Sequence, residues 1–219
     1  MYGNNLTDSS SIHLASGIRS NQTLRTLDLS GNHLEGPHFR DLMVALTTSR
    51  IEELHFHGSR LTDSSCPDLA SGIRDNQTLR TLDLSGNHLE GPHFRDLMAA
   101  LTTSRIEELL LNDNNLTDSS CPDLALGIRD NRTLRRLHLC RNHLEGPHFS
   151  HLMTALTTSR IEELFLNCNN LVSSSCPHLA LGIRNNRTLR RFDLSYNNLE
   201  GPHFRDLMEA LTTSQIEEL

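Results

Sequence analysis

The stretch Leu24–Leu34, with the sequence LRTLDLSGNHL, returns unchanged at Leu79–Leu89. Substituted versions follow at Leu134–Leu144 and Leu189–Leu199, so each copy begins 55 residues after the one before. A second version of the phrase starts between these copies, again at intervals of 55 residues, at Ile51, Ile106, Ile161 and Ile216. The chain is therefore an array of units that alternate between 27 residues (Leu24 to Ile51) and 28 residues (Ile51 to Leu79). Repetition of this length predicts a solenoid.

Each unit predicts a short strand followed by a helix. Leu27 and Leu29 alternate with polar residues, which is typical of a strand with one buried face. After Gly36 and Pro37, apolar residues recur at helical spacing, at Phe39, Leu42, Met43 and Leu46. An asparagine in the ninth position of the phrase is expected to bond the turn that follows the strand, and Ser59 is the one departure from it.

These units match L-x-x-L-x-L-x-x-N-x-L, the leucine-rich repeat pattern. Parallel strands pack about 4.8 Å apart, whereas helix axes need about 8–10 Å, so the stack must bend. The predicted fold is an α/β, curved, right-handed solenoid with a parallel sheet on the concave face and helices on the convex face. We expect one domain over residues 1–219, of about eight units, without recognisable caps and belonging to a longer array.

Composition excludes several classes of partner. The net charge of −7 argues against nucleic acid and against an anionic membrane surface, because both require a basic patch. No stretch approaches the length of about 20 apolar residues that a membrane span needs, and the first residues lack the features of a signal peptide. Five cysteines without a secretion signal favour a cytoplasmic protein with reduced thiols. No cofactor is expected.

The period and the helical return resemble the ribonuclease-inhibitor class of leucine-rich repeats. The phrases Asn76–Ser85 (NQTLRTLDLS) and Leu61–Ala70 (LTDSSCPDLA) resemble the C-terminal repeats of NACHT-type innate immune receptors (NLRs). This resemblance covers the whole chain and implies a repeat domain that senses ligands and restrains an ATP-binding NACHT module. The chain itself has no phosphate-binding G-x-x-x-x-G-K-[ST] loop.

Comparison of the internal copies indicates where a ligand binds. The helix-start segment Gly-Pro-His-Phe is identical in all four copies, whereas the outward strand positions vary. In the N-terminal half these positions hold small polar residues such as Asp28, Ser30 and Gly31, and in the C-terminal half they become large and mixed. Aromatic residues and arginine are common energetic anchors of interfaces. The predicted ligand site on the concave face consists of Leu110, Arg136, His138, Arg141, Phe165, Arg191 and Tyr196.

Three further features carry weaker functional expectations. His55 and His57, with Asp28 and Asp83, form a secondary candidate for zinc, although solvated histidines beside carboxylates are the favoured interpretation. The second position alternates between Arg and Glu along the array, which predicts a ladder of surface ion pairs. Cys140 and Cys168 fall on neighbouring strands and are expected to be reactive surface thiols.

The sequence therefore predicts a non-enzymatic protein-recognition module with a protein ligand on its concave face. The alternatives are an enzyme inhibitor of the ribonuclease-inhibitor type, a GTPase-activating repeat protein and a scaffold. Apolar residues near both ends, such as Leu6 and Ile216, also predict end-to-end self-association.

Overall fold

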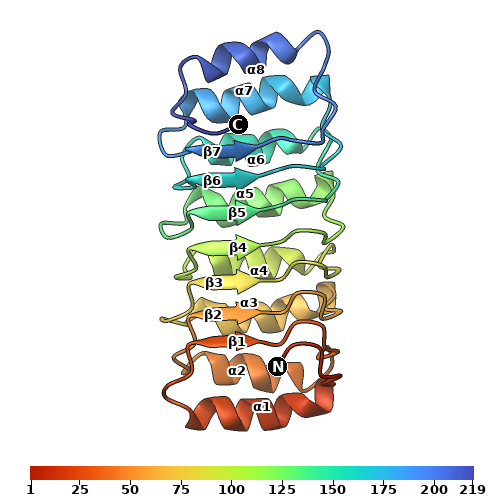
Figure 1. Cartoon of the computed structure of the whole chain (residues 1–219), viewed down its shortest axis with the longest axis vertical. Coiled ribbons are helices and arrows are strands. Elements are labelled where there is room, and N and C mark those ends of the chain that lie inside the picture. Colours follow the sequence, from red (N-terminus) through yellow and green to blue (C-terminus); the bar gives the residue numbers. More distant parts are fainter.

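The computed structural model describes residues 1–219 as a single stack of strand–helix units (Figure 1). Seven strands form one sheet in sequence order: β1 (Thr26–Asp28), β2 (Glu53–His55), β3 (Thr81–Asp83), β4 (Glu108–Leu110), β5 (Arg136–His138), β6 (Glu163–Phe165) and β7 (Arg191–Asp193). All neighbouring strands are parallel. The predicted fold class is confirmed.

Eight helices cover one side of this sheet, and the other side, called here the sheet face, is free of them (Figure 1). The helices are α1 (Asp8–Ser20), α2 (Phe39–Leu46), α3 (Cys66–Arg74), α4 (Phe94–Leu101), α5 (Cys121–Arg129), α6 (Phe149–Leu156), α7 (Cys176–Asn185) and α8 (Phe204–Leu211). Short 3₁₀ turns precede three of them, at Asp63–Ser65, Asp118–Ser120 and Ser173–Ser175. The helices α1 and α8 lie at opposite ends of the stack.

A continuous apolar core runs between the sheet and the helices. Each strand contributes its central residue to this core, as Leu54 and Leu82 do, and the helices α2, α4 and α6 contribute the stripe predicted from the spacing of their apolar residues. Phe39 and Phe56 pack edge to face with their ring centroids 5.6 Å apart. The core is thin because every unit adds only one strand and one helix, so each layer is stabilised mainly by its neighbours.

Buried asparagines satisfy the backbone where the chain turns away from the sheet. The Asn87 side-chain oxygen accepts from the backbone N–H groups of Ser59 and Leu61, and its amide group donates to the carbonyl oxygen of Phe56 at 2.9 Å. Asn32, Asn142 and Asn197 make equivalent bonds. At Ser59, the departure noted in the sequence, the hydroxyl donates to the carbonyl oxygen of Leu29 at 3.2 Å. The asparagine ladder thus continues through this unit with fewer bonds.

The invariant Gly-Pro-His-Phe segment joins successive units on the helical side. The Asp8 carboxylate accepts from the backbone N–H of His38 at 2.8 Å, at the start of α2, where a negative charge is favoured by the helix dipole. Gly36 allows this approach, because a Cβ atom there would lie 2.5 Å from Cγ of Asp8 and the backbone φ is +152°. Identity of this segment among copies therefore has a structural cause.

Candidate functional site

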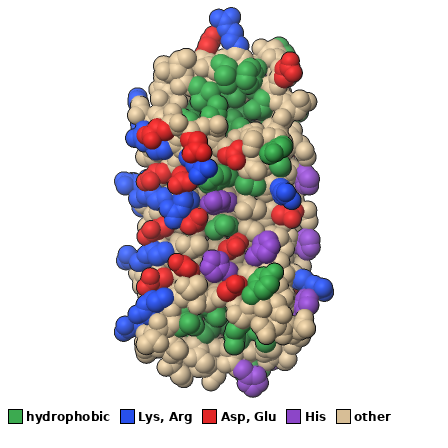
Figure 2. Space-filling view, viewed as in Figure 1, with side chains coloured by type: hydrophobic (Ala, Val, Ile, Leu, Met, Phe, Trp, Pro, Cys, Tyr) green, Lys and Arg blue, Asp and Glu red, His purple; other side chains and the backbone are tan.

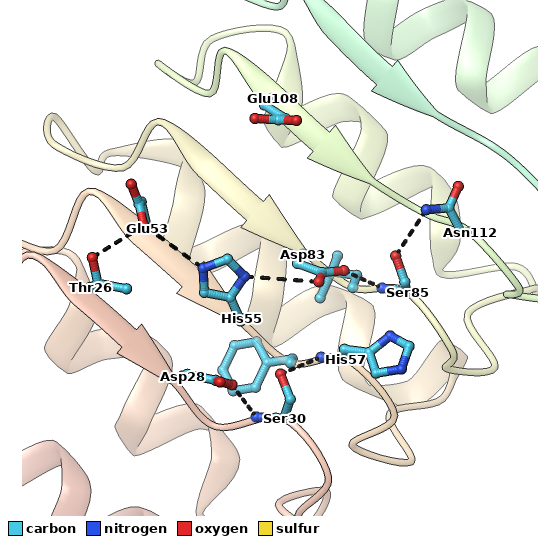
Figure 3. Close-up of polar contacts among 12 residues, drawn as sticks. Thr26, Asp28, Ser30, Glu53, His55, His57, Asp83, Ser85, Glu108 and Asn112 are labelled. Carbon is cyan, nitrogen blue, oxygen red and sulfur yellow. Dashed lines mark hydrogen bonds and ion pairs between the residues drawn. The ribbon is translucent and has the colours of Figure 1, made fainter. Parts of the chain in front are cut away.

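The N-terminal half of the sheet face carries a network of polar side chains, named here the N-terminal patch: Asp28, Ser30, His55, His57 and Asp83 (Figure 3). The His55 ring lies between the carboxylates of Glu53, at 4.0 Å, and Asp83, at 3.8 Å. Asp28 accepts from the backbone N–H of Ser30 at 2.9 Å. These side chains therefore largely contact one another.

The secondary zinc candidate is not assembled in the structure. No group of three or more His, Cys, Asp or Glu side chains is arranged to hold a metal ion. His57 contacts Ser30 through its backbone N–H, which donates to the serine hydroxyl at 3.1 Å, and its ring points away from His55 (Figure 3). Burial would raise the pKa of Asp28, but hydrogen bonds from Ser30 outweigh it and lower that pKa.

The C-terminal half of the sheet face holds the residues predicted to bind a ligand, named here the C-terminal patch: Leu110, Arg136, His138, Arg141, Phe165, Arg191 and Tyr196. The register places Leu110, His138 and Phe165 in one row across β4, β5 and β6. The His138 and Phe165 rings are stacked, with centroids 4.3 Å apart and planes 12° from parallel. Phe165 is only partly buried. The structure thus brings an aromatic stack to the surface.

Arginines flank this stack on the side where the strands begin. The guanidinium carbon of Arg191 lies 5.2 Å from the centroid of the Phe165 ring, within the range of a cation–π contact. Arg136 donates to the Glu108 carboxylate at 3.0 Å, and His138 contacts the same carboxylate at 3.2 Å. Glu108 therefore connects two predicted site residues, a role that the sequence analysis missed.

The ionisable groups around Glu108 shift one another's pKa values. Burial alone would raise the pKa of Glu108, but the hydrogen bonds and charges of Arg136 and His138 outweigh it and lower that pKa. The hydrogen bond to Glu108 raises the pKa of Arg136. Burial lowers the pKa of His138, against the opposing effect of Glu108. Near neutral pH the stack therefore presents a neutral imidazole next to two arginines.

Arg141 and Tyr196 lie apart from the stack, in the turns that follow β5 and β7. Neither side chain makes a hydrogen bond or ion pair within the chain, and Tyr196 is 85% exposed. Both have a left-handed backbone, with φ values of +56°. The first three units have glycine at this position, Gly31, Gly58 and Gly86, whereas the last four have Asp113, Arg141, Cys168 and Tyr196. A left-handed conformation costs a non-glycine residue about 1–2 kcal/mol, so the C-terminal turns hold large side chains in a strained backbone.

The ladder of charges predicted from the second repeat position is confirmed. Arg25 pairs with Glu52 and Arg80 with Glu107, each at 3.3 Å, and the series continues toward the C-terminal end. Figure 2 shows acidic and basic side chains alternating along the edge of the sheet face where the strands begin. These pairs are half exposed, so each adds little to stability.

The expectation of two reactive thiols is wrong for Cys140. Burial is the main cause that raises the pKa of the Cys140 thiol to about 11, with Asp193 adding to the effect. A thiol with that pKa is almost entirely protonated at neutral pH and is a poor nucleophile. Cys66 and Cys121, on α3 and α5, are buried, and burial raises their pKa values as well.

The sequence of this chain is similar to those of known leucine-rich repeat proteins. A family model described as "Leucine Rich repeat" matches residues 20–37, 75–92 and 185–202. Ribonuclease inhibitor from Sus scrofa is 30% identical over 213 residues, which cover 94% of this chain and 47% of the inhibitor. NACHT, LRR and PYD domains-containing protein 12 from Homo sapiens is 31% identical over 192 residues, which cover 85% of this chain and 18% of that protein. The chain thus spans about half the length of the inhibitor.

Solved structures show the same fold. The C-terminal domain of Caenorhabditis elegans tropomodulin matches 68% of this chain and 91% of its own, with a TM-score of 0.54 and 17% identity. An internalin from Listeria monocytogenes matches 88% of this chain and 52% of its own, with a TM-score of 0.51 and 16% identity.

No helix is both long enough and apolar enough to cross a bilayer.

Proposed function

We propose that this chain, a leucine-rich repeat protein homologous to ribonuclease inhibitor and to the NACHT, LRR and PYD domains-containing proteins, recognises another protein through the C-terminal patch. The observation that carries the proposal is the partly exposed stack of His138 and Phe165 beside Arg191. Aromatic and arginine side chains in a desolvated centre supply most of the binding energy of typical protein interfaces.

The strained turns support the same surface. Glycine at the position of Arg141 and Tyr196 would remove the strain, as it does in the first three units. The C-terminal half instead places long side chains there, beside a row that ends in an aromatic ring. Strained backbone is often retained where a side chain serves a function. Arg141 and Tyr196 are proposed to contact the partner at the border of the stack.

A more specific proposal concerns the class of receptor to which this repeat array belongs. Several of the relatives carry a NACHT module, and we propose that this repeat array acts in the cytoplasm as the ligand-sensing part of such an innate immune receptor. The proposed function is binding without catalysis. The Ser30 hydroxyl accepts from the backbone N–H of His57 at 3.1 Å.

The second candidate is inhibition of ribonucleases, and the homology to ribonuclease inhibitor favours it. The two candidates are separated by titrating the chain into a pancreatic-type ribonuclease assay. Loss of ribonuclease activity at equimolar chain would support the inhibitor, and unchanged activity would leave the receptor-type function.

Affinity capture with the immobilised chain tests the choice of surface. Proteins retained by wild type are quantified against those retained by Phe165→Ala and by His93→Ala, which changes the helical side. The proposal expects specific partners to be lost with Phe165→Ala and kept with His93→Ala. Equal loss with both variants, or retention by both, would contradict it.

A further inference from the structure

A groove runs along helices α5 and α6 on the helical side of the stack, in its middle units. Its volume is about 510 Å³, and it adjoins a second hollow of about 380 Å³ that shares Arg129 and Thr158 with it. The lining of the first part includes Pro122, Ala125 and Leu126. The second part lies where the two helices end, and no apolar residue lines it. Together they are called here the α5–α6 groove, which has an apolar part and a polar part.

The charge of the α5–α6 groove differs from that of the equivalent residues in the other copies. Four arginines and two aspartates line it, a net charge of +2: Arg95, Arg129, Arg132, Arg160, Asp123 and Asp130. The equivalent residues of the preceding copy are three arginines and three aspartates, without net charge: Arg40, Arg74, Arg105, Asp68, Asp75 and Asp96. In the following copy two arginines are balanced by Asp206 and Glu209. The chain has a net charge of −7, so this positive groove is a local exception.

Two of these arginines have no partner within the chain. In the preceding copy, Nε of Arg105 donates to the side-chain oxygen of Gln77 at 2.6 Å. Arg132 and Arg160 occupy the two equivalent positions, and both are exposed without a hydrogen bond or ion pair. Of the four copies, only this one has arginine at both positions. An anionic group between the two guanidinium groups would offset their mutual repulsion.

The helix ends account for only one arginine of the polar part. Arg129 lies in the last turn of α5, where a cation balances the helix dipole, as Arg74 does in α3. Arg132 and Arg160 lie beyond the helices, in the segments that lead to β5 and β6. Asp130 pairs with Arg129 at 3.2 Å. The other two arginines are therefore left without a counter-charge and are available to an acidic ligand.

The helical part of the groove is more apolar than its equivalent in the preceding copy. Leu126 occupies the position that Ser71 has in α3. Ala125 is partly exposed, whereas the equivalent alanines of α3 and α7 are buried. His151 stands where α4 has Asp96, so one carboxylate of the equivalent site is absent. An apolar side chain of a ligand can therefore pack on α5.

We propose that the α5–α6 groove binds an extended acidic segment of a protein partner. An apolar side chain of that segment packs on Ala125 and Leu126, and the carboxylates that follow it bind Arg132 and Arg160. Arginine suits this role because its planar guanidinium binds a carboxylate through two hydrogen bonds. The groove and the C-terminal patch lie on opposite sides of the sheet, so the acidic segment binds independently of the partner proposed for that patch.

Two substitutions test the groove with residues that the fold already accommodates in another copy. Arg132→Gln and Leu126→Ser introduce the residues that occupy these positions in the preceding copy. Arg74→Gln is the control for charge, because it removes an exposed arginine from α3, outside the groove. Leu181→Ser is the control for the apolar contact, because Leu181 is the equivalent exposed leucine of α7.

Fluorescence anisotropy measures the binding of a fluorescein-labelled peptide in which a pair of leucines is followed by a run of glutamates. Wild type should bind this peptide, and its affinity should fall as sodium chloride is added. Arg132→Gln and Leu126→Ser should each raise the dissociation constant at least about threefold, because each removes one contact of the peptide. The two control variants should bind as wild type does, and so should Phe165→Ala.

A wild-type dissociation constant above about 1 mM would overturn the proposal. An equal loss of affinity in Arg74→Gln would do the same, because the peptide would then respond to the charge of the whole chain. Loss of binding in Phe165→Ala would place the peptide on the sheet face instead. Equal affinity for a peptide with lysines in place of the glutamates would exclude recognition of an acidic segment.

Discussion

The two halves of the sheet face have the same backbone and different surfaces. In the N-terminal patch, side chains such as Asp28 and Ser30 bond one another and the backbone, and the turns are built on glycine. In the C-terminal patch the row becomes Leu110, His138 and Phe165, and the turns carry large residues in a left-handed backbone. Because the backbone is equivalent in both halves, the fold does not require the large side chains of the C-terminal patch. These side chains are therefore available to contact a partner.

The largest expected effect is on binding. Phe165→Ala should weaken binding of a captured partner by about 1–3 kcal/mol, because it removes the ring that stacks on His138 and underlies Arg191. Tyr196→Ala should weaken it by a similar amount. Isothermal titration calorimetry with the purified partner measures both. Asp28→Ala, at the position equivalent to Phe165, is the control, and an equal loss there would remove the distinction between the halves.

A second prediction exchanges the residue types at the left-handed turn position of the two halves. Tyr196→Gly should raise the free energy of unfolding by roughly 0.5–1 kcal/mol, since relief of the left-handed backbone exceeds the added entropy of the unfolded chain. Gly58→Tyr should lower it by a similar amount, because Gly58 has a φ of +59° and open space around its Cβ position. Urea unfolding measures both changes. If Tyr196→Gly destabilises the chain instead, Tyr196 has a packing role within the fold.

A third prediction concerns the pH dependence of the C-terminal patch. The pKa of His138 lies below its usual value of 6.5 and that of Glu108 below its usual value of 4.5. At both groups the folded chain binds fewer protons than the unfolded chain, so the free energy of unfolding should fall as the pH decreases below about 6.5. Thermal unfolding at several pH values measures this decline.

The variant His138→Gln isolates the contribution of the imidazole. It should flatten the decline between about pH 6.5 and pH 5, and leave the part below about pH 4.5 that belongs to carboxylates such as Glu108. A pH profile identical to that of wild type would show that His138 does not titrate differently in the folded and unfolded chain.

The smallest effect is expected at the turn that departs from the asparagine pattern. Asn114 and Asn169 donate to the carbonyl oxygens of Leu84 and Leu139, at 2.9 and 2.8 Å, but the side-chain oxygen of each is buried without a partner. Ser59→Asn should replace the hydroxyl bond to Leu29 with the amide bond that Asn114 and Asn169 make. The second amide bond that it adds and the unpartnered oxygen should largely offset each other. The melting temperature should hardly change, and a large increase would mean that the oxygen is satisfied.

The fold followed from the sequence because each unit repeats the same local signals. The alternation around Leu27 and the helical stripe that begins at Phe39 were sufficient to place strands, helices and their faces. Because the same pattern recurs in every unit, each unit supported the same assignment of strand and helix. The register of Leu110, His138 and Phe165 also followed, since equivalent positions in parallel strands are neighbours.

Other parts of the site could not be predicted, for physical reasons. Backbone φ at Tyr196 depends on the turn that glycine defines in earlier copies, so the strain became evident only with the structure. The role of Glu108 depends on side-chain reach across strands. Cys140 was expected to be reactive from its place on a strand, whereas its pKa is set mainly by burial.

The most direct test of the account is a hydrogen-exchange map of the chain, recorded with and without a captured protein partner. A bound partner should slow exchange in β5, β6, β7 and the turns around Arg141 and Tyr196. Exchange in β1, in β2 and in the helices should be unchanged. Protection confined to the N-terminal patch or to the helical side would contradict the claim that the C-terminal patch is the binding surface.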